Sequence, residues 1–184
     1  MSSVKKACIC SFCAALCYVL PLAFHAMALG SVFSPMHLPV LLCGLLCGWP
    51  YGAFCGIAGP VISCVLSGGM PSPVQLVYMV PELCVYGLAA GIGMRLIRTG
   101  KIVMDIYLSL LPAMLLGRVV GGAAQAVFYF STARSYSAAL WASSYVAGTL
   151  PGAVLQLVVL PALVLSLARA RLIPARYPKE GASA

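Results

Sequence analysis

Three apolar stretches of the sequence each carry polar side chains at steps of three, four or seven residues. Such steps place each set on one face of a helix. A charged side chain costs about 2.5–3.5 kcal/mol to insert into lipid, so the faces that contain Glu82 and Arg118 should turn inward. The three sets are Gln75, Tyr78, Glu82 and Tyr86; Arg118, Gly122, Gln125 and Tyr129; and Tyr145, Thr149, Gly152 and Gln156.

These inward faces suit the recognition of a polar organic solute. An ion pathway would instead need rows of carbonyls or carboxylates. Two interpretations of the charged residues stay open: Glu82 and Arg118 belong to a ligand pocket, or they only join two helices. At about 1.5 Å per residue, Arg118 lies about 8 Å deeper than Glu82. We therefore predict that Arg118 binds an anionic group of the ligand, most simply a carboxylate.

The sequence offers almost no acid–base chemistry for an enzyme. It has three acidic residues, Glu82, Asp105 and Glu180, and only Glu82 lies deep in an apolar stretch. It contains no zinc-protease, nucleophile-elbow or phosphate-loop motif. We predict a protein without catalytic residues and without a cofactor.

The nine cysteines all lie in or at the ends of apolar stretches. Cys13 and Cys17 are four residues apart, as are Cys43 and Cys47, a spacing that would put two soft metal ligands on one helix face. No carboxylate or histidine completes a cluster in the same helix. We interpret the cysteines as small apolar residues at helix contacts and predict no metal site.

The bilayer is the solvent of this chain. The 88 residues from Ala7 to Met94 include one charged side chain, Glu82, and the whole chain is 62% hydrophobic with a mean hydropathy of +1.05. A soluble domain of this size still needs a polar exterior, so we predict an integral membrane protein. The net charge of +8 does not indicate nucleic acid, because nine of the eleven basic residues flank apolar segments.

The elements that position the polar residues are all helical. We predict one domain over residues 1–184 with helices at 4–29, 38–48, 53–66, 74–97, 105–130 and 144–167. The second helix is too short to span about 30 Å of hydrocarbon and follows a long external loop, 30–37. Six crossings put both termini and all three basic clusters in the cytoplasm. Lys5-Lys6 and Ala26-Met27-Ala28 also resemble a signal peptide, but the apolar stretch exceeds the usual ~7–15 residues, so we predict an uncleaved helix.

Small residues recur every four positions at the start of the first helix. Ala7, Ser11 and Ala15 would let another helix approach closely. Their place at the cytoplasmic end predicts a docking face that an intracellular partner can reach.

The arrangement resembles the substrate-binding S components of energy-coupling factor (ECF) vitamin transporters. The run 33–52 is similar to that family's first loop, short second helix and following turn, and Gly59-Pro60, Pro81-Glu82-Leu83 and Tyr86-Gly87 are similar to members of the group that contains several vitamin carriers. The resemblance covers most of the chain. It implies a multi-pass protein of the bacterial plasma membrane that binds a vitamin or precursor with high affinity from outside.

The resemblance also implies partners. A transmembrane coupling subunit and two cytosolic ATPase subunits would drive transport. Ala7, Ser11 and Ala15 match the motif that contacts the coupling subunit, with serine where alanine is more usual. The loop 30–37 is expected to close over the pocket. The predicted substrate-binding residues are His37, Tyr78, Glu82, Tyr86, Arg118, Gln125, Tyr129, Thr149 and Gln156.

The alternative is a stand-alone small-solute facilitator or secondary transporter. The sequence shows no internal repeat, which disfavours a secondary transporter. The sequence does not name the vitamin, although a pantothenate-like acid suits Arg118 better than a cation such as thiamine.

Overall fold

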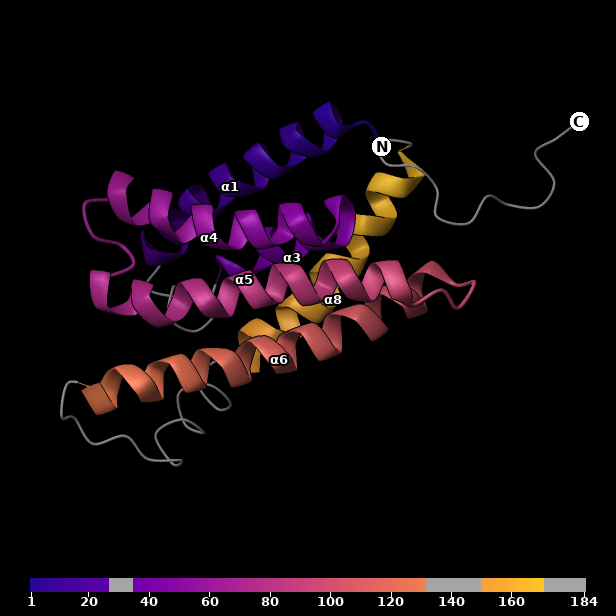
Figure 1. Cartoon of the computed structure of the whole chain (residues 1–184). Helices are drawn as coiled ribbons and strands as arrows, with labels where there is room; N and C mark the ends of the chain where they lie inside the picture. Colours follow the sequence, from indigo (N-terminus) through magenta and orange to yellow (C-terminus); the bar gives the residue numbers. More distant parts are fainter. Residues whose placement is uncertain (27–34, 132–149, 171–184) are drawn as a thin grey trace, which may run out of the picture.

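The computed structural model describes residues 1–26, 35–131 and 150–170 and is all-helical over these residues. The predicted all-helical architecture is therefore confirmed for the described part of the chain (Figure 1), whereas the six crossings and the orientation of the termini stay predictions. Among the residues that the structure describes, five helices are long and apolar enough to cross a membrane, while the 11-residue α3 is too short to do so, as predicted. The helices are α1 (Ser3–Ala26), α3 (His37–Cys47), α4 (Trp49–Leu66), α5 (Pro73–Leu96), α6 (Ile102–Ser131) and α8 (Leu150–Arg169).

The helices α1, α3, α4, α5 and α6 each begin one to four residues before their predicted starts, and α6 begins at Ile102 rather than at residue 105. His37 was predicted in the external loop but is the first residue of α3. The helix predicted from residue 53 begins at Trp49, because Gly48 reverses the chain with a φ of 93° and Pro50 fits the first turn of a helix. Residues 27–29 and 144–149, which the prediction placed in helices, lie outside the described residues.

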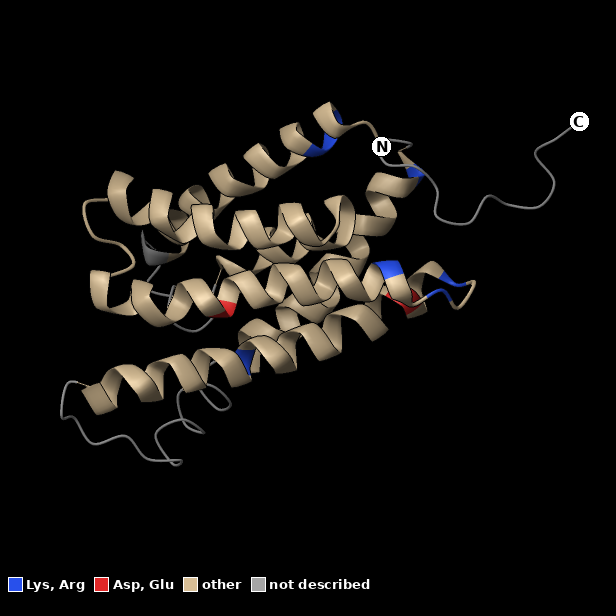
Figure 2. Ribbon diagram, in the orientation of Figure 1, with Lys and Arg blue, Asp and Glu red and all other residues tan. Residues whose placement is uncertain are grey.

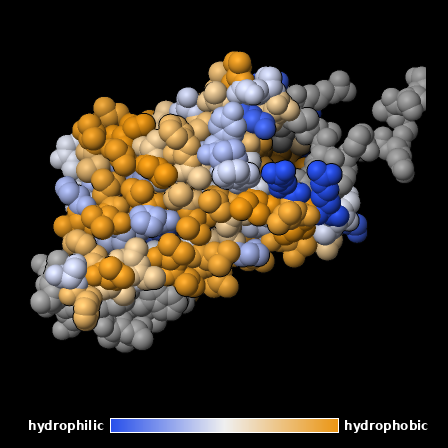
Figure 3. Space-filling model, viewed as in Figure 1, coloured by the Kyte–Doolittle hydropathy of each residue, from blue (hydrophilic) through white to orange (hydrophobic). Residues whose placement is uncertain are grey.

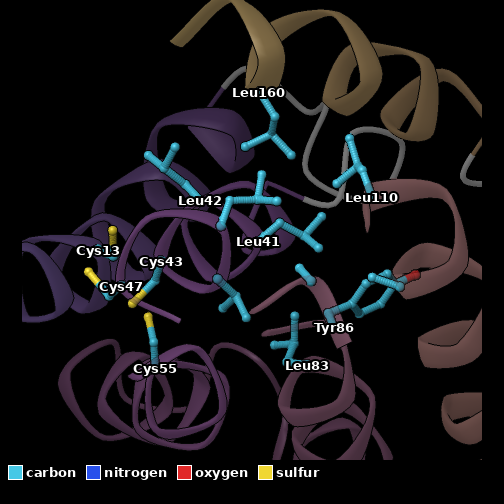
Figure 4. Packing of buried hydrophobic residues seen from close by; sticks show 14 of the residues in the cluster. Cys13, Leu41, Leu42, Cys43, Cys47, Cys55, Leu83, Tyr86, Leu110 and Leu160 are labelled. Carbon is cyan, nitrogen blue, oxygen red and sulfur yellow. The ribbon is translucent and has the colours of Figure 1, made fainter. Parts of the chain in front are cut away.

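The short helix α3 lies inside the bundle. It packs against α1, α4 and α5, and Val40, Leu41 and Cys43 on it are fully buried. Figure 4 shows Leu41 and Leu42 among side chains from α5, α6 and α8. A helix that is apolar on every side is expected to be buried in this way.

Many of the exposed side chains on the long helices are apolar. Phe12, Phe54 and Val65 are exposed on α1 and α4, and Leu115 and Val127 on α6. Figure 3 shows apolar surface over much of the visible face. This surface and the five long apolar helices identify a multi-pass membrane protein.

Six buried thiols fill the contact between α1, α3 and α4. Figure 4 shows four of them, Cys13, Cys43, Cys47 and Cys55, gathered in one region. Cys10 and Cys43 share the Tyr51 carbonyl as acceptor at 3.5 Å, and Cys47 donates to the Lys6 carbonyl at 3.6 Å. The six thiols are Cys10, Cys13, Cys17, Cys43, Cys47 and Cys55. Their burial at helix contacts confirms the interpretation of these cysteines as small apolar residues.

Glycines bring α3, α4 and α5 together until their backbones touch. A Cβ atom on Gly87 of α5 would collide with the carbonyl oxygen of Gly52 on α4. A Cβ on Gly44 of α3 or on Gly52 would in turn collide with the Gly87 carbonyl oxygen. The neighbouring atoms belong to backbone and cannot swing away, so the three helices pack closely only without these side chains.

We expect Gly87→Ala to destabilise the folded protein by about 1–3 kcal/mol, the range that is typical of overpacking. The measurement is the melting temperature and the monodisperse yield of the purified protein in detergent. Ala123→Val is the matched control, because it adds carbon to an exposed position of α6. A Gly87→Ala protein that melts like the wild type would contradict the close packing.

Candidate functional site

A buried polar pair joins α3 to α5. Glu82 Oε1 lies 3.4 Å from His37 Nε2, and the two residues are only 6% and 8% exposed. Glu82 comes directly after Pro81 within α5, and His37 begins α3. A buried carboxylate is destabilising unless it is paired or hydrogen-bonded, so the histidine stabilises Glu82 in this position.

Tyr86 connects the pair to α6. It lies one turn beyond Glu82 on α5, and its ring meets the His37 ring edge-on with centroids 4.9 Å apart. Its hydroxyl group lies within electrostatic and hydrogen-bonding reach of the Arg118 guanidinium of α6. His37, Glu82, Tyr86 and Arg118, all predicted binding residues, therefore form one cluster at the junction of α3, α5 and α6.

Two glycines of α6 form the opposite wall of this cluster. A Cβ on Gly121 would lie 2.6 Å from Glu82 Oε2, and a Cβ on Gly117 would lie 2.8 Å from carbons of the Tyr86 ring. The α6 backbone thus contacts both side chains directly, and Arg118 follows Gly117 in the chain. The sequence interpretation missed this pair because it placed Gly122 on the polar face. The Gly117–Gly121 spacing of four residues was the available signal.

We expect Gly121→Ala to lower the melting temperature because the new methyl group meets the Glu82 carboxylate. Overpacking of this kind costs about 1–3 kcal/mol. Combining it with Glu82→Ala, which removes the opposing carboxylate, should give a smaller loss than the sum of the two single losses. Additive losses in this double-mutant cycle would show that Gly121 and Glu82 are not in contact, and Ala123→Val again serves as the control.

The tyrosines of the predicted set extend the cluster along α5 and α6. Tyr78, one turn before Glu82, is half-buried and lies within electrostatic reach of Glu82 and of Tyr129 on α6. Gln125 lies one turn beyond Gly121 and is also half-buried. The spacing argument therefore placed Tyr78, Glu82 and Tyr86 correctly on one face of α5, opposite residues of α6.

Gln75 does not share that role. It is exposed and closes the start of α5 in a reciprocal cap, where Ser72 Oγ accepts from the Gln75 amide at 3.3 Å and Gln75 Oε1 accepts from the Ser72 amide at 3.2 Å. A glutamine three residues after a serine is typical of such a cap. The polar face of α5 therefore begins at Tyr78.

The helix α8 contributes one of its predicted residues to the interior. Gln156 is 2% exposed, and α8 packs against α3 and α6. Thr149 lies outside the described residues, as does Tyr145. Of the predicted covering loop, Phe33 lies outside them as well, whereas Met36 is buried beside His37 and its carbonyl accepts from the Cys17 thiol at 3.8 Å.

The predicted docking residues face outward. Ala7, Ser11 and Ala15 are exposed on α1. The buried Cys10 and Cys13 lie between them in sequence and on the opposite side of the helix, against α3 and α4. The start of α1 therefore presents a face of small side chains.

Among the described residues, no three histidine, cysteine, aspartate or glutamate side chains are placed to hold a metal ion. The cluster around Glu82 instead offers a carboxylate, an imidazole, a guanidinium and phenolic hydroxyl groups. Groups of these kinds are the ones that can form hydrogen bonds with a polar organic molecule.

Comparison with known proteins gave one family. A family model described as "ECF transporter, substrate-specific component" matches residues 5–164. The match begins in α1 and ends in α8, and it includes every residue of the cluster around Glu82. Searches of curated proteins and of solved structures returned no match.

Proposed function

Because the chain belongs to the substrate-specific (S) component family of ECF transporters, we propose that the cluster of His37, Glu82, Tyr86 and Arg118 is the centre of its substrate site. S components are the substrate-binding subunits of ECF importers and are not enzymes. The observation that carries the proposal is the junction of α3, α5 and α6, where the buried polar side chains of His37, Glu82 and Tyr86 meet the half-buried Arg118. Binding sites for small molecules combine apolar walls with a few convergent polar groups in this way.

The substrate we propose is a vitamin or vitamin precursor that carries a carboxylate. Arg118 presents the planar fork of donors that matches two carboxylate oxygens. The Tyr86 hydroxyl beside it is neutral, and a bidentate carboxylate is a stronger acceptor for a guanidinium than a hydroxyl group is. Glu82 and the tyrosines would then take the hydroxyl and amide groups of the ligand. A pantothenate-like acid fits this pattern.

The His37–Glu82 contact supports a role for both residues in binding. At 3.4 Å it is longer than the usual range of a strong hydrogen bond between charged groups. A ligand donor that reaches Glu82 at a shorter distance would therefore replace this contact at little cost in free energy. Tyr78, Gln125, Tyr129, Thr149 and Gln156 complete the proposed site.

The transport partners we propose are a transmembrane coupling subunit and two cytosolic ATPase subunits. The outward face of Ala7, Ser11 and Ala15 supports docking through α1, because small side chains let a second helix approach. The basic residues at the ends of α5 and α8 support a cytoplasmic location for that end of the bundle.

A thermal-shift screen tests the proposed substrate class. The purified protein is incubated with acidic, neutral and cationic vitamins, and its melting temperature is measured with each. At a ligand concentration of about 100 times Kd, binding should add about 2.7 kcal/mol of stability. We expect stabilisation by an acidic vitamin or precursor. Stabilisation by a cationic vitamin alone would contradict the proposed role of Arg118 while leaving the family assignment intact.

A further inference from the structure

The cations of the described residues gather at one end of the bundle. Figure 2 marks Lys and Arg positions in blue at the start of α1, at the end of α8 and around the α5–α6 turn, and Arg118 lies farther along α6. Within the described residues, the turn between α4 and α5 at the opposite end carries no Lys, Arg, Asp or Glu. The cations that form this basic end are Lys5, Lys6, Arg95, Arg98, Lys101 and Arg169.

Three of these cations lie on or next to the α5–α6 turn, whose backbone is closed by side-chain hydrogen bonds. The buried Asp105 carboxylate accepts from the Thr99 amide at 2.8 Å and from the Thr99 hydroxyl at 2.7 Å. Arg98 and Lys101 flank this closed turn, and Arg95 lies in the last turn of α5. All three basic residues are exposed, whereas the nearby carboxylate lies beneath the turn. The outer surface of the turn is therefore positively charged.

Exposed apolar side chains stand directly beside these cations. Leu96, next to Arg95, is 74% exposed, and Val103 and Met104 lie just after Lys101 at the exposed start of α6. A membrane surface satisfies both kinds of side chain, because acyl chains accept the apolar groups while headgroups meet the charges. An acidic protein segment would leave Leu96 in water. The pattern therefore favours lipid over a protein partner.

We propose that the basic end is a binding surface for anionic phospholipid headgroups, with Arg95, Arg98 and Lys101 at its centre. Each basic residue near a negatively charged membrane surface adds to the attraction, and the contributions act together when the cations are close. The lipid phosphates replace the counterions of the exposed cations. This surface is distinct from the site around Glu82, and the proposal does not depend on the substrate.

The test uses the full chain in phosphatidylcholine vesicles that contain about 20% phosphatidylglycerol. Spin-labelled phosphatidylglycerol and phosphatidylcholine report, by electron paramagnetic resonance, how much of each lipid the protein immobilises. We expect about threefold preference for phosphatidylglycerol in the wild type, weakened by added salt. The neutral triple variant Arg95→Gln, Arg98→Gln, Lys101→Gln should lose most of this preference.

A charge-preserving control separates charge from shape. The variant Arg95→Lys, Arg98→Lys, Lys101→Arg should keep the wild-type preference. Equal immobilisation of both lipids by the wild type, or an unchanged preference in the neutral variant, would overturn the proposal. A neutral variant that keeps its lipid preference but no longer assembles with the ATPase-bound coupling subunit would assign the basic end to protein docking instead, and would also overturn it.

Discussion

Arg118→Ala is expected to abolish high-affinity ligand binding, and Arg118→Lys to weaken it by about 1.5–3 kcal/mol. This range corresponds to roughly 10- to 150-fold in Kd. Arginine binds a carboxylate through two parallel hydrogen bonds, which the single ammonium of lysine cannot reproduce. Isothermal titration of the purified protein with the ligand found in the thermal-shift screen measures the effect.

The size of the loss in binding affinity should depend on which group of the cluster is changed. Glu82→Gln is expected to weaken binding less than Arg118→Ala, because glutamine keeps one carbonyl oxygen that accepts from His37 or from the ligand. Ala123→Val, on the exposed side of the same helix, should bind like the wild type. A folded Arg118→Lys protein with affinity within twofold of the wild type would eliminate anion recognition and leave Arg118 as a contact between α5 and α6.

Ser11→Trp and Ala15→Trp are each expected to abolish uptake without affecting ligand binding by the isolated protein. Both residues are exposed on α1, so the indole ring has space in the free subunit. It would instead prevent the close approach of a partner helix, which requires small residues at the contact. Uptake into cells and titration of the purified subunit measure the two effects separately.

The control for this pair lies on the same helix. Leu22 is also exposed on α1 but stands near the opposite end, away from Ala7, Ser11 and Ala15. Leu22→Trp should therefore leave both uptake and binding intact. Continued uptake by both the Ser11→Trp and Ala15→Trp proteins would show that α1 docks its partner through another face.

The sequence predicted the helical fold well because lipid imposes strong constraints on it. Long apolar stretches separated by Gly and Pro located five long helices and the short α3. Helix starts were less accurate. A proline is compatible with the first turn of a helix. For this reason α4 includes Pro50 and begins at Trp49 rather than at the predicted residue 53.

The candidate site could be predicted along each helix but not between helices. Steps of four residues identified Tyr78, Glu82 and Tyr86 as one face of α5. The His37–Glu82 pair depends on how α3 packs against α5, which no local pattern encodes. The same holds for Gly117 and Gly121, whose importance comes from the Tyr86 and Glu82 side chains opposite them. Gln75 followed the same spacing but caps a helix end, because a polar residue in a first turn has backbone partners nearby.

The most direct test of the proposed site is to identify the small molecule that remains bound during purification. Native mass spectrometry of the wild-type protein should reveal one bound organic molecule that carries a carboxylate. The same molecule should be present on Ala123→Val and absent from Arg118→Ala, with both variants folded. A bound molecule without an anionic group, or one retained at wild-type occupancy by Arg118→Ala, would contradict the proposal that Arg118 and the cluster around Glu82 bind the transported substrate.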